Sequence, residues 1–246
     1  RVLARLDTWG IRADDSAGGP FRKTVAGTLI DQVIEVAATD FAPAAVVALL
    51  RHPLARLGLD IGSARRAARS LEIAAFRTAY LGRGIAGIEA ALEMAARQAV
   101  DGERRERAVR AIGTDRWAAA RDLVARLAAA LGPLEALFES DTPRAMREIV
   151  AAHVAAVEAV ARAPDREDNP IWDEEAGRSA SLFFAGLLDE RILAPAIAPA
   201  DYPDLYRTLV AAEAVRPRVP VHPRIFIWGP YEARLQQADV LVLGSL

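Results

Sequence analysis

The fold class is decided at residues 221–246, which read VHPRIFIWGPYEARLQQADVLVLGSL. Two short apolar runs, 225–228 and 240–243, flank a polar turn that carries Glu232 and Arg234. Each run is rich in aliphatic residues and is too short for a buried helix, so both are predicted to be parallel strands of a core sheet. Nearly everything upstream is patterned as helix. We therefore expect a mainly α chain with a small parallel β element at its C-terminal end.

The rest of such a sheet has no counterpart upstream, and the chain ends on an apolar run without a closing turn. The first residue is Arg, and the methionines stand at positions 94 and 146. We therefore expect the chain to be a piece of a larger protein, whose missing residues complete the sheet and make the whole protein α/β.

Composition sets limits on function. The 246 residues carry 31 basic and 33 acidic groups, a net charge of −2, so any contact with DNA must come from local patches. Cysteine is absent, which excludes disulfides, cysteine-bound zinc and a cysteine nucleophile within this span. No secretory leader and no apolar run of about 20 residues is visible, so we expect a soluble, cytoplasmic chain without a membrane partner.

Apolar spacing and capping residues predict a succession of helices. The clearest interior loop is 163–172, which contains Pro164, Asp168 and Pro170. It divides the chain into a helical part, 1–163, and a part, 164–246, whose helices lead into the two terminal strands. The predicted helices span 24–38, 43–50, 63–80, 85–100, 114–131 with a continuation past Gly132-Pro133 to 138, 143–162, 173–193 and 204–215.

Three blocks resemble one protein family. The run 222–246 resembles the segment of AddB that precedes an Asn-Glu-Gly-x-Trp-Pro motif; AddB is the second subunit of the bacterial AddAB double-strand-break repair helicase–nuclease. Residues 9–11 with 14–18, WGI and DDSAG, and residues 48–58, ALLRHPLARLG, are similar to further AddB segments. The blocks occur in the family's order and bracket almost the whole chain, so the chain is identified as an internal helicase-like fragment of an AddB-type subunit.

The resemblance implies a role in DNA repair beside an AddA-type helicase–nuclease subunit, with single-stranded DNA as the second partner. The last stretch is also similar to a UvrD-like helicase segment, but Arg234 stands where those helicases carry lysine. Gln237 replaces the glutamate that helps to hold the nucleotide sugar. These two differences agree with an AddB-type subunit whose helicase motor has lost its function. The family further implies an iron–sulfur cluster and Mg elsewhere in the parent protein, with no cofactor in this span.

Basic residues without acidic neighbours are the candidates for phosphate contact. Arg51 and His52 follow a helix end at a proline turn, where both are expected to point outward; a solvated helix terminus is the alternative. Arg65, Arg66 and Arg69 cluster on the following helix, where a mixed solvent face is the commoner interpretation. From pattern and resemblance together, the predicted DNA-binding residues are Arg51, His52, Arg218, Arg224 and Arg234.

Catalytic motifs are absent from the sequence. There is no GxxxxGK[ST] loop, HExxH or serine elbow, and Lys23 has no patterned carboxylate partners, so we expect a catalytically silent region. Asp14 and Asp15 are predicted to lie in a turn. His153 is predicted to be a packed bystander. Two alternatives stay open: a free-standing metal-dependent enzyme using Asp14, Asp15, Asp173 and Glu174, and a purely structural helical spacer.

Overall fold

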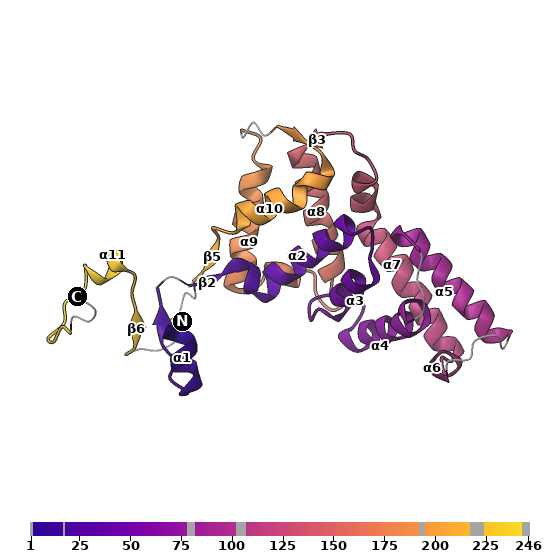
Figure 1. The fold of residues 1–246 in the computed structure, drawn as a ribbon, viewed down its shortest axis with the longest axis horizontal. Coiled ribbons are helices and arrows are strands. Elements are labelled where there is room, and N and C mark those ends of the chain that lie inside the picture. Colours follow the sequence, from indigo (N-terminus) through magenta and orange to yellow (C-terminus); the bar gives the residue numbers. More distant parts are fainter. Residues whose placement is uncertain are drawn as a thin grey trace.

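The computed structural model describes residues 2–16, 18–77, 82–101, 107–191, 195–216 and 224–242. The fold is mainly helical, as predicted, with short two-residue strands (Figure 1). The helices are α1 Val2–Thr8, α2 Val25–Ala38, α3 Pro43–Arg51, α4 Ile61–Leu71, α5 Gly84–Val100, α6 Arg107–Arg110, α7 Thr114–Phe138, α8 Met146–Ala161, α9 Glu174–Leu188, α10 Tyr202–Val210 and α11 Pro230–Ala233. The strands are β1 Asp14–Asp15, β2 Gly19–Pro20, β3 Arg144–Ala145, β4 Ala196–Ile197, β5 Ala214–Val215 and β6 Phe226–Ile227.

The long helix α7 is the centre of the helical body, because α4, α5 and α8 all pack against it. Its leucines at 123, 127 and 131 are fully buried, as their four-residue spacing predicts. The predicted interruption at Gly132-Pro133 is wrong, since the helix runs through Pro133 to Phe138. Proline removes one backbone donor, and burial of Leu131 and Leu134 on either side offsets that loss.

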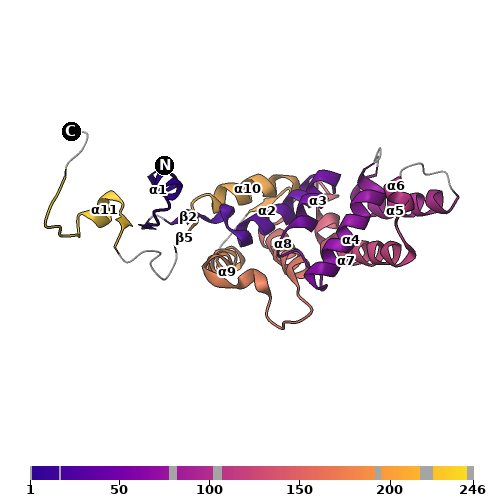
Figure 2. The ribbon, with the colours of Figure 1, turned by 90° about the horizontal axis from the view of Figure 1, so that it is seen from below.

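Helix α2 joins the two halves of the body, with α3 and α7 on one side and α8, α9 and α10 on the other (Figures 1 and 2). Thr24 caps it as predicted, its Oγ1 accepting from the Gly27 amide at 3.0 Å. The predicted boundary at 163/164 falls between α8 and α9, and α9 packs on both α8 and α2. None of the helices in the described ranges is long and apolar enough to cross a membrane.

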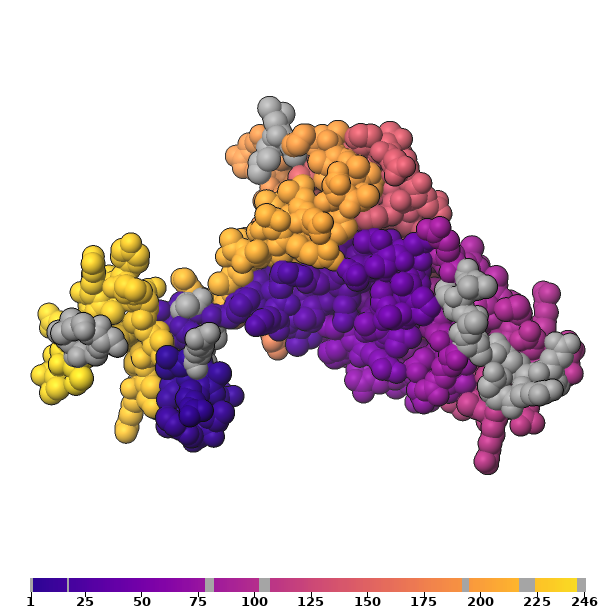
Figure 3. Space-filling view, in the orientation of Figure 1, coloured from indigo at the N-terminus to yellow at the C-terminus, as the bar shows by residue number. Residues whose placement is uncertain are grey.

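The two terminal segments, 2–16 and 224–242, form a terminal unit that stands off the helical body (Figure 3). Strand β6 pairs in parallel with β1, and β2 pairs antiparallel with β5 where the chain enters and leaves the body. The predicted turn at Asp14-Asp15 is therefore wrong, because both residues lie in β1. The prediction that 240–243 is a second core strand is also wrong over its described part: Val240, Leu241 and Val242 are exposed and not in a strand, and residue 243 lies outside the described residues.

The helical body is expected to fold without the terminal unit. Within 2–16 and 224–242, Ala13 is the one buried residue, so these segments add almost nothing to the core. A chain of residues 18–216 should therefore unfold within about 3 °C of the full chain. Thermal unfolding followed by circular dichroism tests this, and a loss of cooperative unfolding in the short chain would contradict it.

Candidate nucleic-acid interface

An arginine cluster surrounds a single carboxylate at the meeting of α3 and α4. Arg51 Nη2 lies 2.8 Å from Glu72 Oε2, and Arg69 Nη1 and Arg77 Nη2 each lie 3.1 Å from Glu72 Oε1. Arg65 lines the same cavity of about 300 Å³ with Arg51 and Arg69. Among the described residues of this site, three guanidinium groups thus pair with one acid and a fourth arginine lines the same cavity, which leaves the surface locally basic.

The local sequence explains the position of each charged side chain in the cluster. Helix α3 ends at Arg51, because His52 precedes Pro53 and takes an extended conformation. Arg65 and Arg69 are four residues apart on α4 and so share one face. At Glu72 the helix widens into a π-helical turn, Glu72–Phe76, a form often found at functional sites. The apolar side chains of Val47, Leu50 and Ala68 complete the cavity wall.

The charges of the cluster keep Glu72 ionised. Burial of Glu72 opposes its charge, but the hydrogen bonds from Arg51 and Arg77 and the charges of Arg51 and Arg69 outweigh it, so the pKa of Glu72 lies below its usual value. The arginines are about half exposed while the Glu72 side chain is largely covered. An incoming phosphate can therefore reach the guanidinium groups from solvent and share them with Glu72.

His52 does not point outward, and that prediction is wrong. The ring is buried, with Nε2 3.0 Å from Thr28 Oγ1 and Nδ1 accepting from the Leu54 amide at 3.2 Å. Burial lowers the pKa of His52, against a smaller opposing contribution from a backbone hydrogen bond at Val25. A neutral, internally bonded ring is a structural part of the helix end, and we do not retain it as a phosphate contact.

The other predicted DNA-binding residues lie elsewhere. Arg224 precedes β6 and Arg234 follows α11, so both belong to the terminal unit, away from Arg51 on α3 (Figure 1). Arg234 stacks over the ring of Tyr231, with Cζ 6.0 Å from the ring centroid. Arg218 lies outside the described residues. The structure therefore brings Arg51 together with the arginines of α4, and not with Arg224 or Arg234.

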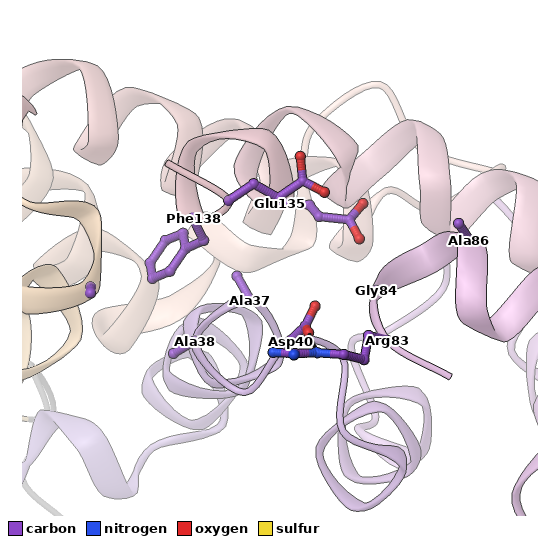
Figure 4. A pocket seen from close by; sticks show the side chains of 10 residues that line it. Ala37, Ala38, Asp40, Arg83, Gly84, Ala86, Glu135 and Phe138 are labelled. Atoms are coloured by element: carbon purple, nitrogen blue, oxygen red, sulfur yellow. Dashed lines mark hydrogen bonds and ion pairs between the residues drawn. The ribbon is translucent and has the colours of Figure 1, made fainter. Parts of the chain in front are cut away.

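A second cavity, of about 510 Å³, opens between α2, α5 and α7 (Figure 4). Arg83 Nε lies 2.5 Å from Asp40 Oδ2, and Glu135 Oε1 accepts from the Ile85 amide at the start of α5, at 2.7 Å. Burial raises the pKa of Glu135, helped by the charges of Glu139 and Asp40 and reduced by the Ile85 hydrogen bond. These pairings already satisfy the helix start, so we assign the carboxylates a structural role.

The metal-site alternative finds no support in the described part of the chain. No three His, Asp or Glu side chains there gather in a way that could hold a metal ion. Asp14 and Asp15 lie in the terminal unit, whereas Asp173 binds Arg166 through both carboxylate oxygens, at 2.6 and 3.2 Å. The acids named for this hypothesis are thus separated or already paired.

Comparisons with known proteins add no identification: no family model, no curated protein and no solved structure matches this chain. Sequence patterning found Arg51, Arg65 and Arg69 but missed Glu72 and Arg77. Their signal is a helix that continues past residue 71 with an acid and a base five residues apart. That spacing is not a regular helical pair, and it becomes one through the π-helical turn.

Proposed function

We propose that this chain is the DNA-guiding, catalytically silent helicase-like region of an AddB-type subunit. In this role it contacts phosphates of single-stranded DNA while an AddA-type partner supplies ATP-driven movement. The observation that carries the proposal is the arginine cluster, in which Arg51, Arg69 and Arg77 pair with Glu72 and Arg65 lines the adjoining cavity. Arginine forks match phosphate oxygens in pairs, and a partly exposed cluster can follow a moving backbone.

The mechanism is electrostatic. Phosphate oxygens accept hydrogen bonds from Arg51 and Arg69 and release condensed counterions, so affinity falls as salt rises. Contacts to phosphate do not depend on which bases the strand contains. They are therefore suited to a surface along which DNA slides. Glu72 holds its paired guanidinium groups in place and competes with each phosphate for them, so the DNA strand can move along the surface.

Replacing Arg51 and Arg69 together with alanine should weaken binding of a single strand about equally for all sequences. The slope of log affinity against log salt should become shallower by about 0.7 for each lost phosphate contact. Fluorescence anisotropy with a labelled oligothymidylate, at several salt concentrations, measures both quantities. Arg191→Ala is the matched control, because it removes one exposed arginine, paired with Asp189, from a different part of the surface.

Glu72→Gln provides the opposite test. It removes the competing carboxylate and keeps its hydrogen-bonding shape, so single-strand affinity should rise and the salt dependence should steepen. An unchanged affinity in both the double arginine variant and Glu72→Gln would contradict a phosphate-binding role for the cluster.

A further inference from the structure

Two aromatic rings lie together at β6: Phe226 belongs to the strand and Trp228 follows its last residue. Phe226 and Trp228 are two residues apart, and their rings are parallel within 4°, with centroids 5.5 Å apart. The two side chains are 40% and 43% exposed, although rings of this size are normally covered. Together they form an exposed aromatic platform that the helical body does not use.

The platform is held in place by backbone pairing. The Asp14 amide donates to Ile225 O at 2.8 Å, the Ser16 amide donates to Ile227 O at 3.0 Å, and the Gly229 amide donates to Ser16 Oγ at 3.1 Å. These three hydrogen bonds join the residues on either side of Phe226 and Trp228 to the β1 segment. A preorganised platform loses little conformational entropy when a flat ligand stacks on it.

The neighbouring charge decides which part of a nucleic acid meets the rings. Asp14 is the register partner of Phe226 across the β1–β6 pair. A carboxylate there repels phosphate, so the backbone is expected to face away while the uncharged base faces the rings. Arginines flank the platform in sequence, at positions 224 and 234. The two rings already stack on each other, with centroids 5.5 Å apart, so a base is expected to stack on an outer face of the pair and not between the rings.

We propose that Phe226 and Trp228 are a base-stacking site for single-stranded nucleic acid. The proposal rests on the proposed function and deepens it, because it adds contact with bases to contact with phosphates. Bases in a duplex hide their faces against each other, whereas single strands expose them to aromatic side chains. The site therefore selects single strands over duplexes and accepts every base.

The test uses the full chain and two probes, an oligothymidylate of about 12 nucleotides and an abasic oligomer of the same length. Trp228→Ala should weaken binding of the oligothymidylate about 5- to 150-fold, because stacking contributes about 1–3 kcal/mol per base. The same change should leave binding of the abasic oligomer unaltered. Trp228→Phe, which keeps a ring, should recover most of the affinity.

Trp9→Ala is the matched control, because Trp9 is an exposed tryptophan of the same terminal unit whose ring already lies under Arg5. It should bind the oligothymidylate as the parent chain does. Equal affinity of the parent and Trp228→Ala for the oligothymidylate overturns the stacking site, while a salt-dependent loss in the Arg51 and Arg69 variant would still support the proposed function. No binding of either probe by the parent chain overturns both proposals.

Discussion

Lowering the pH from 7 to 4 is expected to remove about 3 kcal/mol of the free energy of unfolding through one side chain, His153. Its pKa is lowered from 6.5 to about 4, chiefly by burial, against a smaller opposing contribution from the hydrogen bond to Ile30. The unfolded chain therefore binds a proton below about pH 6.5 that the folded chain refuses until about pH 4. Stability is lost as the pH falls through this window.

The surroundings of His153 explain why it stays neutral. Nε2 lies 3.0 Å from the carbonyl oxygen of Ile30, so it must carry the proton, and Nδ1 then accepts from the hydroxyl of Tyr202 at 3.0 Å. The rings of Phe184, Tyr202 and Tyr206 meet it edge to face, with centroids 5.4–5.8 Å away. A second proton on Nδ1 would force the Tyr202 hydroxyl to change from donor to acceptor and would place a charge in an aromatic enclosure.

Urea unfolding of the parent chain and of His153→Gln at pH 7, 5.5 and 4.5 measures this contribution. Glutamine cannot be protonated, so the difference between the two chains should shrink as the pH falls, while the carboxylates common to both cancel. A difference that stays constant across this range would show that His153 does not control acid stability.

Local patterns predicted the helices well and the joints between them poorly. The four-residue recurrence of leucines in α7 and the Thr24 cap were correct, because both depend on neighbours within one or two turns. Asp40, between α2 and α3, instead takes a positive φ of 52° and pairs with Arg83, forty-three residues away. An ion pair between residues so far apart in the sequence cannot be predicted from a short stretch of neighbouring residues.

At the candidate site, too, local sequence patterns did not predict the contacts between residues that are distant in the sequence. Arg51 could be predicted from its position before a proline turn, whereas its partner Glu72 is 21 residues away and meets it through the packing of α3 on α4. The sequence predicts an outward His52 because the residue follows a helix end at a proline turn, but Thr28 of α2 binds it from inside. The sequence predicts parallel core strands at 225–228 and 240–243, but it does not show that β6 pairs with β1, more than 200 residues earlier.

Gly177→Ala should destabilise the protein by about 3 kcal/mol, although helix propensity alone predicts a gain of about 1 kcal/mol. Gly177 is a buried residue of α9, and its backbone packs directly on the turn 170–172. A methyl group there would lie 2.5 Å from the carbonyl oxygen of Trp172 and 2.6 Å from that of Ile171. These are backbone atoms of a packed turn, so they cannot move aside without shifting α9 from α8.

Gly186→Ala in the same helix separates the two effects. An added methyl group at Gly186 meets no atom within 4 Å, so only helix propensity acts, and the free energy of unfolding should rise by about 0.5–1 kcal/mol. Urea unfolding of both variants at pH 7 measures the contrast. Opposite signs are expected because close backbone approach outweighs propensity at Gly177; a gain of stability in both variants would mean that α9 does not pack on the 170–172 turn as described.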